Sequence, residues 1–426
     1  MSAELDIAVL NAGTVHTMRG PVPRRGREML DTGAVRGAAV GVKDGRIAYV
    51  GPEDGLEAAG FRIGPRTEVL DAAGGDVIPG FVDSHTHLIW LGDRRGEFAE
   101  MLKGRSYADI TAAGGGINTT VRGTRHAALE ELEGAGFERA MRMLAHGTTA
   151  LEAKSGYALE TEGELKMLEA AARVAARTPQ IVEHTFLGAH LVPYDYRGRK
   201  AEYVRLVVEE MLPRAAEQGI ARFNDVFLEF NAFDREETRL ILEEGKKLGL
   251  IPKLHADELS DMDGAALAVE LGAASCDHLE YTNEEGMRAL ARSDTVATLM
   301  PGTSFFLNLP SHAPFGKFYE HGCAVALATD FNPGTSPSLT MQGAFALGVL
   351  ALRMPVEAAL CAATVNGAFS LRIHDRTGSI EPGKRADLVV LGGSVTDVAY
   401  HWGENHARYV VCGGRKAAEG GRIVLQ

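Results

Sequence analysis

Cysteine is scarce in this 426-residue chain, and its four cysteines form no C-x-x-C pair. They stand far apart in the sequence, at Cys276, Cys323, Cys361 and Cys412. Thiols spaced in this way in a long chain are typical of a reducing compartment, and they exclude a small disulfide scaffold.

Long apolar runs are missing as well. No stretch approaches the roughly 20 apolar residues that a helix needs to span a bilayer. The acidic segment 1–6 carries no basic residues ahead of an apolar core, so we expect no secretory signal. These absences predict a cytoplasmic protein without a membrane partner.

An excess of basic residues is also absent. The chain has 44 lysines and arginines against 57 aspartates and glutamates, a formal net charge of -13 and a sequence pI near 5.6. An acidic surface repels phosphate backbones, so nucleic acid is not expected as a partner. A small anionic substrate remains possible, because one local arginine overrides the global field.

The two ends of the chain share short β-patterns flanked by glycines. They lie at 6–10 and 37–50 near the start, and at 386–391 and 409–412 near the end. The length and the 45% hydrophobic content leave room for a barrel-sized domain between them.

Apolar strands alternate with helix-like stretches through the middle of the chain. Strand candidates span 77–82, 148–152, 181–187, 225–228, 250–254, 275–279, 295–300 and 324–328. Helical stretches such as 162–177, 203–218 and 235–247 separate most of them. About eight βα units in a row predict a TIM barrel, whose active site lies at the C-terminal ends of the strands. The alternative is an open doubly wound sheet, but no G-x-G-x-x-G follows the first strand.

The expected fold is therefore α/β, a (β/α)8 TIM barrel with a small composite β-sandwich domain. We expect the barrel over residues 78–370, and the sandwich from both chain ends, residues 1–77 and 371–426. The glycine-rich segment 112–116 is expected to be a loop between two βα units.

A pair of histidines follows the first barrel strand, in Ser84-His85-Thr86-His87. Side chains two residues apart in extended backbone project to the same face, so both imidazoles can converge on one ion. An H-x-H pattern alone is a weak signal, because two solvent-facing loop histidines read the same way.

Three further strand ends carry suitable groups. They are His255, the triplet Cys276-Asp277-His278, and Asp330. Imidazoles and a carboxylate suit Zn²⁺ or Fe and leave a coordination position for water. We expect one Zn²⁺ or Fe ion per chain, with His85, His87, His255 and Asp330 as its ligands.

Asp330 and His278 are the candidate catalytic residues beside this ion. A bound divalent ion lowers the pKa of water to about 7, and Asp330 is suited to hold the released proton and pass it to the leaving nitrogen. His278 lies one strand from His255, where it either hydrogen-bonds the water or the scissile carbonyl, or supports a ligand.

A two-metal site is the alternative. Lys154 invites comparison with the carbamylated lysine that bridges two metals, but that lysine is needed after strand four, and Lys154 follows strand two. A single metal is therefore favoured, with Glu229 after strand four leaving a weak second site possible.

Several longer motifs carry a resemblance to a known family. The segments 79–87 and 378–388 resemble the amidohydrolase superfamily. Narrower motifs resemble the imidazolonepropionases, and they lie at 92–98, 112–117, 154–157, 185–190, 254–259 and 328–336. The resemblance runs over nearly the whole chain.

The resemblance implies the hydrolysis of a cyclic amide, 4-imidazolone-5-propanoate, to N-formimidoyl-L-glutamate in histidine degradation. It implies that this small-molecule substrate contacts Arg94, Tyr157, His190, Glu258, Asn332, Gly334 and Thr335. Glu258 would lie beside the ring nitrogens as a further catalytic residue. Arg94 would grip the propanoate, since a guanidinium matches a carboxylate bidentately, although a surface ion pair with Glu97 is the plainer alternative. A homodimer is implied by resemblance alone.

Two segments depart from the family pattern, 228–233 after strand four and 302–307. Two other functions also remain open. A ring deaminase would use the same ligands and release ammonia, and a non-catalytic metal-binding protein would use the same scaffold.

Overall fold

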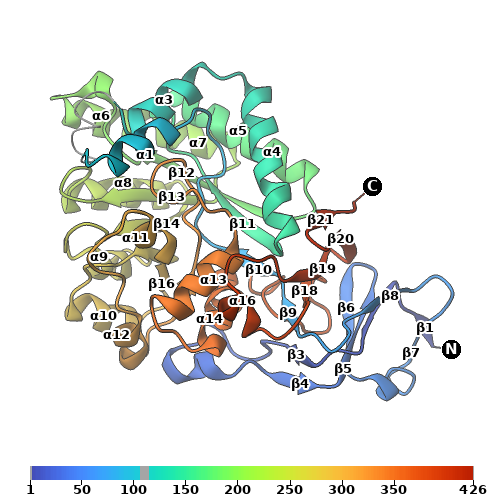
Figure 1. Ribbon diagram of the computed structural model, residues 1–426. Coiled ribbons are helices and arrows are strands. Elements are labelled where there is room, and N and C mark those ends of the chain that lie inside the picture. The colour runs from blue at the N-terminus through green and yellow to red at the C-terminus, as the bar shows by residue number, and fades with distance from the viewer. Residues whose placement is uncertain (1, 106–114, 426) are drawn as a thin grey trace.

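The computed structural model describes residues 2–105 and 115–425. Figure 1 shows a barrel surrounded by helices. A smaller β-rich part lies next to the barrel, where the blue N-terminal and red C-terminal segments meet. The expected α/β fold, a TIM barrel with a β-rich companion from both chain ends, is confirmed. The domain limits at 77 and 370 stay a prediction.

Eight parallel strands form one sheet in chain order in the described part of the chain. They are β10 (Phe81–Asp83), β11 (Thr148–Lys154), β12 (Ile181–Ala189), β13 (Phe223–Leu228), β14 (Ile251–Ala256), β15 (Ser275–His278), β16 (Val296–Leu299) and β17 (Val325–Leu327). All but three of their residues are buried, as expected of strands covered on both faces.

Backbone hydrogen bonds join the two ends of this sheet at the C-terminal side of the strands. The Asp330 N–H donates to the His85 carbonyl at 3.1 Å, and the His87 N–H donates to the Phe331 carbonyl at 2.9 Å. The segment that carries both histidines is thus fixed to the loop that carries Asp330.

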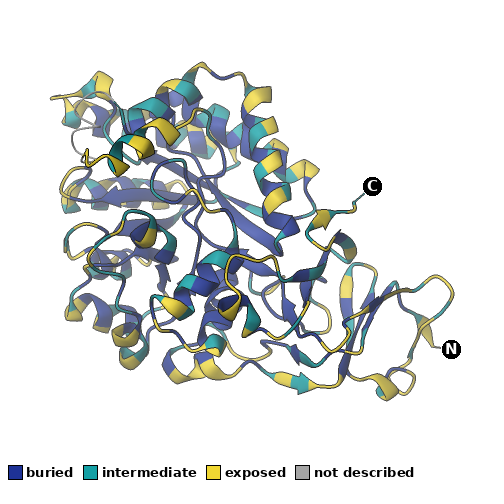
Figure 2. Cartoon of the chain, in the orientation of Figure 1, coloured by how far each residue is buried: buried dark blue, intermediate teal, exposed yellow. Residues whose placement is uncertain are grey.

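Helices cover the outside of the barrel. They are α1 (Arg95–Leu102), α3 (Ile117–His126), α4 (Leu129–Ala145), α5 (Thr161–Arg177), α6 (Lys200–Leu206), α7 (Leu212–Gln218), α8 (Arg235–Lys247), α9 (Gly264–Glu270), α10 (Glu284–Ala291), α11 (Pro301–Phe306), α12 (Phe315–His321), α13 (Met341–Leu350), α14 (Val356–Ala362) and α15 (Val365–Ser370). Figure 2 shows their buried faces turned toward the strands. No helix among the described residues combines the length and the apolar character needed to cross a membrane.

Local sequence explains where helix α8 begins. At α8 the Asp234 side chain accepts from the Glu237 N–H, and the Glu237 side chain accepts from the Asp234 N–H, a reciprocal cap that satisfies two orphan donors. One expected helix, 203–218, is divided. A π-helical turn, Val207–Met211, separates α6 from α7.

The β-rich companion contains two larger sheets. One has the order β21 (Arg422–Ile423), β20 (Arg415–Glu419), β19 (Ala407–Cys412), β18 (Leu388–Leu391), β9 (Val77–Pro79), β3 (Thr14–His16) and β4 (Ala34–Arg36). The other has the order β6 (Arg46–Pro52), β5 (Ala38–Lys43), β2 (Ile7–Leu10) and β8 (Glu68–Asp71), and β1 (Ala3–Glu4) pairs with β7 (Phe61–Arg62). A short helix, α16 (Asp397–Tyr400), precedes β19. Val9 and Val40 share one apolar core with Leu388 and Val411, so both chain ends build this part.

The expectation of a single strand over 77–82 is wrong. β9 pairs antiparallel with β18 in the companion sheet, and β10 pairs parallel with β11 in the barrel. The change of sheet occurs at Gly80, where an added Cβ would lie 2.1 Å from Thr149 Oγ1. Glycine therefore permits the close approach at which the chain passes from one sheet to the other.

Candidate active site

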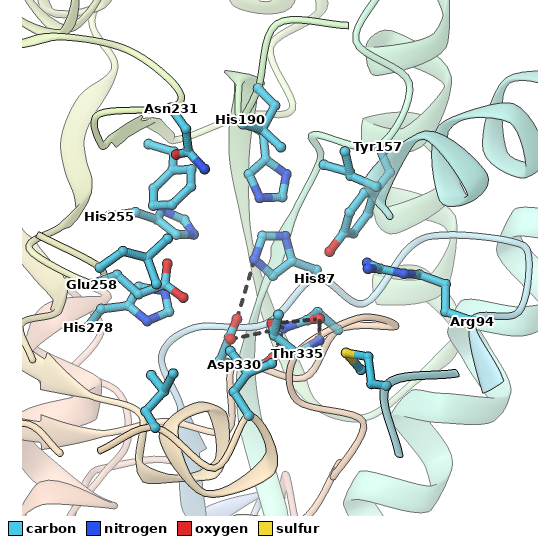
Figure 3. A pocket seen from close by; sticks show the side chains of 18 of the residues that line it. His87, Arg94, Tyr157, His190, Asn231, His255, Glu258, His278, Asp330 and Thr335 are labelled. Atoms are coloured by element: carbon cyan, nitrogen blue, oxygen red, sulfur yellow. Dashed lines mark hydrogen bonds and ion pairs between the residues drawn. The ribbon is translucent and has the colours of Figure 1, made fainter. Parts of the chain in front are cut away.

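A cavity of about 450 Å³ opens at the C-terminal ends of the barrel strands. Its lining unites side chains from residues 87 to 335, including Arg94, Tyr157, His190, Glu258 and Asp330 (Figure 3). Nearly all the candidate residues expected from the sequence are therefore brought together. His85 lies just below the lining, fully buried, and Gly334 lines a smaller adjoining pocket.

Three histidines gather at the floor of this cavity. Nitrogens of His85, His87 and His255 lie within 4.8 Å of one another, and ligand atoms of His85, His278 and Asp330 form a second such group. Asp330 Oδ1 lies 3.6 Å from Nε2 of both His85 and His87. Two ligands bound at about 2.1 Å from a tetrahedral ion lie about 3.4 Å apart, so this spacing suits a shared metal.

The ring nitrogens at this floor also fit a metal chemically. Nε2 of His85 and Nε2 of His255 are buried and have no hydrogen-bond partner among the described residues. Burial lowers the pKa of both His85 and His87 well below the ordinary histidine value, and the charged Lys154 adds to this effect. The rings are therefore neutral near pH 7 and present lone pairs, which is the form that binds a metal.

Asp330 is held from both sides in the loop after β17. Its Oδ2 accepts from Thr303 Oγ1 at 2.7 Å and from Asn332 Nδ2 at 2.9 Å, which leaves Oδ1 turned toward the histidines. Burial raises its pKa to about 6, although the Thr303 hydrogen bond opposes the shift. Its φ of 49° and that of His278, 84°, lie in the left-handed region, where non-glycine residues often mark functional sites.

Thr303 was missed in the sequence. It belongs to α11, and a threonine at this position carries no recognisable signal in the sequence. Asn231 was also missed. It lines the cavity from the segment 228–233, which follows β13.

Asn332, Gly334 and Thr335 form a closed turn above Asp330. Asn332 Oδ1 accepts from the Gly334 N–H at 2.8 Å and from the Thr335 N–H at 2.7 Å. These bonds satisfy Asn332 locally and point its Nδ2 at the Asp330 carboxylate.

Arg94 is buried at the other side of the cavity, between helix α1 and this turn. Its Nε donates to Glu97 Oε2 at 2.9 Å, and Glu97 Oε1 accepts from Thr119 Oγ1 at 2.7 Å. An added Cβ on Gly334 would lie 2.0 Å from Arg94 Nη1. The ion pair with Glu97 therefore exists, but it is not a surface ion pair, because it holds a buried guanidinium at the cavity.

Tyr157 and His190 lie together above His87. Tyr157 is buried, and the His190 ring stacks on His87 with centroids 5.0 Å apart. His190 Nδ1 lies 3.0 Å from the Gly156 carbonyl, which only accepts, so Nδ1 carries the proton. Burial lowers the pKa of His190 to about 3, so the ring is neutral and Nε2 is an acceptor.

Glu258 and His278 lie close together on a third side of the cavity. Glu258 Oε2 lies 3.8 Å from His278 Nε2. Burial raises the pKa of Glu258 well above its ordinary value, and the neighbouring Glu280 carboxylate adds to the rise. Burial also raises the pKa of Glu280 itself to about 7. Glu258 is thus inclined to carry a proton and to donate a hydrogen bond.

Lys154 and Glu229 are both engaged elsewhere. Lys154 ends β11, the second barrel strand as expected, and its Nζ donates to Asp225 at 2.6 Å. Burial alone would lower its pKa, but the carboxylates of Asp225 and Glu152 outweigh burial and raise it. A charged amine is a poor candidate for carbamylation. Glu229 uses both oxygens to accept from the loop after β14, including the Leu259 N–H at 2.9 Å.

One expected motif lies partly outside the described residues. Residues 112–114 of the glycine-rich segment 112–116 are not described. Gly116 stands at the start of α3 with a φ of 67°, and its N–H donates to Glu97 Oε1 at 3.1 Å.

The chain matches the amidohydrolase family over residues 77–417. It is 46% identical over 421 residues to an imidazolonepropionase of Symbiobacterium thermophilum, covering 98% of this chain and 99% of that protein. It is 44% identical over 414 residues to an imidazolonepropionase of Myxococcus xanthus, covering 97% of both.

Solved structures of low identity share the fold. A zinc-bound adenosine deaminase of Xanthomonas campestris has a TM-score of 0.69 at 17% identity, covering 100% of this chain and 95% of its own. E. coli guanine deaminase has a TM-score of 0.66 at 16% identity, and the match covers 97% of this chain and 99% of the deaminase. The family match and the full-length relatives place the chain among the imidazolonepropionases of the amidohydrolase family.

Proposed function

We propose that this chain hydrolyses the ring amide C–N bond of 4-imidazolone-5-propanoate to N-formimidoyl-L-glutamate, a step of histidine degradation. The observation that carries the proposal is one cavity that unites a histidine–aspartate cluster with the Arg94 guanidinium. The full-length relatives named imidazolonepropionase support the choice of substrate.

The chemistry calls for one metal ion per chain, Zn²⁺ or Fe, and the donor set suits either. His85, His87, His255 and Asp330 would hold it, because their free ligand atoms converge at the cavity floor. A divalent ion held there would lower the pKa of a water molecule toward about 7 and polarise the substrate carbonyl.

Proton transfer falls to Asp330. Its Oδ1 faces the cluster while Thr303 and Asn332 fix Oδ2, so the carboxylate is aimed before substrate arrives. It takes a proton from the attacking water and delivers it to the ring nitrogen that leaves the carbonyl carbon. His278 lies beside this path and hydrogen-bonds the developing oxyanion.

Substrate orientation falls to the side chains around the cavity wall. Arg94 binds the propanoate as a planar fork. His190 Nε2, an acceptor, takes a ring N–H, and Glu258 in its protonated form donates to the ring. Tyr157 closes the wall beside His190. Asn332 and Thr335 form the turn that the ligand meets, and Gly334 leaves room for Arg94.

A non-catalytic binding protein is the weaker alternative. Pure metal storage needs neither the deep cavity above the cluster nor the buried guanidinium at its wall. The homodimer and the cytoplasmic location stay predictions.

The test is a direct assay of the purified protein with 4-imidazolone-5-propanoate. Substrate loss and formimidoylglutamate formation should proceed together, and they should stop after chelation of the metal and resume on its return. Asp330→Asn should retain the fold and lose nearly all turnover. Turnover in the fully chelated protein at the untreated rate would refute the metal-dependent proposal.

A further inference from the structure

Five charged side chains lie in the interior of the barrel beneath the histidine cluster, all of them at most 1% exposed. We call them the lysine–carboxylate lattice, and they are Glu152, Lys154, Asp225, Lys253 and Asp277. Burying charge is costly, and apolar residues of similar size commonly serve stability as well or better. The lattice therefore calls for an explanation beyond stability.

The two lysines join the three carboxylates into one connected set. Lys154 Nζ lies 2.6 Å from Asp225 Oδ2 and 3.0 Å from Glu152 Oε2. Lys253 Nζ lies 2.8 Å from the same Glu152 oxygen. Both ammonium groups lie 3.9 Å from Asp277 Oδ2. Each acidic side chain therefore pairs with a lysine from another strand of the barrel.

Two of these carboxylates also contact histidines of the cluster above them. Asp277 Oδ2 is hydrogen-bonded to His85 Nδ1 at 2.7 Å. Asp225 Oδ2 lies 2.9 Å from His255 Nδ1, an ion-pair contact whose angles do not meet those of a hydrogen bond. Both contacts are made at Nδ1, on the side of the ring away from the cavity. The hydrogen bond at His85 favours the proton on Nδ1 and leaves Nε2 as the lone-pair donor, and the Asp225 carboxylate beside His255 Nδ1 favours the same tautomer electrostatically.

The lattice also fixes the backbone of the H-x-H segment. Lys253 Nζ donates to the Ser84 carbonyl at 2.8 Å, directly before His85. Thr86 Oγ1 donates to the Glu152 carbonyl at 2.5 Å, directly after it. His85 is therefore held at its ring and on both sides of its backbone by groups of the lattice and its strands.

We propose that the lysine–carboxylate lattice is a positioning device for the metal site. Asp277 and Asp225 orient the rings of His85 and His255, and Lys154 and Lys253 hold those carboxylates in place. The inference rests on the proposed function, which makes both histidines metal ligands. Loss of a carboxylate behind a ligating histidine typically lowers metal affinity by about 10- to 100-fold.

The variants Asp277→Asn and Asp225→Asn test this directly. Each keeps the shape of the side chain, but its amide cannot serve the lysines and the histidine together as a carboxylate does. Zn²⁺ alone is titrated into the metal-free full-length protein against a chromophoric chelator. We expect each variant to bind Zn²⁺ about 10- to 100-fold more weakly than the unmodified chain.

Glu164→Gln is the matched control. Glu164 is a fully buried carboxylate on helix α5, and it accepts hydrogen bonds from backbone N–H groups, including those of Ala158 at 2.8 Å and Leu159 at 2.7 Å. Its variant should lose thermal stability and keep Zn²⁺ affinity within about twofold, since it touches no proposed ligand. The comparison separates positioning from the general cost of altering a buried acid.

Each outcome decides the question. Asparagine variants that fold and bind Zn²⁺ as tightly as the unmodified chain overturn the inference and leave the proposed function standing. An unmodified chain that binds no metal overturns the proposed metal site itself. If only one asparagine variant folds, its affinity decides. If neither folds while Glu164→Gln does, the lattice is structural and the inference is wrong.

Discussion

Gly334→Ala offers a sharp test of how Arg94 is positioned. The φ of Gly334 lies outside the left-handed region, so its backbone accepts alanine. The new Cβ, however, would lie 2.0 Å from Arg94 Nη1 and 2.7 Å from its Cζ. Because real Cβ contacts stay beyond 3.0 Å, the guanidinium must move by about an ångström, and a displacement of that size can cost about 100-fold in rate.

The expected magnitude follows from the contact that is disturbed. A hydrogen bond to a charged group contributes about 1.5–3 kcal/mol, and about 1.4 kcal/mol corresponds to a factor of ten. We therefore expect Gly334→Ala to lower kcat/KM for imidazolone propanoate by about 10- to 100-fold, with unchanged metal content. Gly316→Ala is the matched control, because nothing lies within 4 Å of its Cβ position.

A double-mutant cycle shows whether the effect passes through Arg94. In an Arg94→Ala background the methyl group meets no guanidinium, so Gly334→Ala should cost little more. An equal loss of kcat/KM in both backgrounds would refute the reasoning, because the alanine would then act without Arg94. Arg94→Lys should not recover the activity that Arg94→Ala loses, since one ammonium does not reproduce the planar fork of a guanidinium.

Three further predictions concern the metal and the fold. His255→Ala should lose most of the single equivalent of Zn or Fe that elemental analysis finds in the unmodified chain, and two equivalents at full occupancy would contradict the mononuclear site. Burial lowers the pKa of His184 to about 4, so the unfolded chain binds the extra proton below about pH 6.5 and stability falls as the pH drops toward 4. When the pH falls from 7 to 5, the free energy of unfolding measured in urea should decrease by about 2 kcal/mol less in His184→Leu than in the unmodified chain. Equal decreases in both proteins would contradict this. Tyr203→Phe removes the buried hydrogen bond to the Gly188 carbonyl at 2.7 Å and should lower the free energy of unfolding by about 1 kcal/mol.

The strand ends were predictable because periodic patterns carry them. A TIM barrel places the C-terminal ends of all its strands on one face, so His85, His255 and Asp330 had to meet once the strands were counted correctly. The H-x-H spacing predicted that the side chains of the first two ligands project to the same face. The cluster at the cavity floor follows from these two facts.

Contacts made between distant loops were not predictable. Nothing in the sequence relates Gly334 to Arg94, because the absence of a Cβ matters only once both lie at one cavity. Thr303 has the same character, since its hydrogen bond to Asp330 depends on how α11 is placed. The split at Gly80 escaped for a different reason, because two adjacent strands in different sheets share one apolar pattern.

The ammonia released per turnover distinguishes ring hydrolysis from deamination most directly. Opening the imidazolone ring adds water across a C–N bond whose nitrogen stays attached through the formimidoyl carbon, so both nitrogens remain in the product. A ring deaminase would use the same histidines and Asp330, and it would release one ammonia in every turnover. We predict complete conversion of 4-imidazolone-5-propanoate with no ammonia above that of a chelated control. Stoichiometric ammonia from an aminated heterocycle, without action on the imidazolone, would contradict the account.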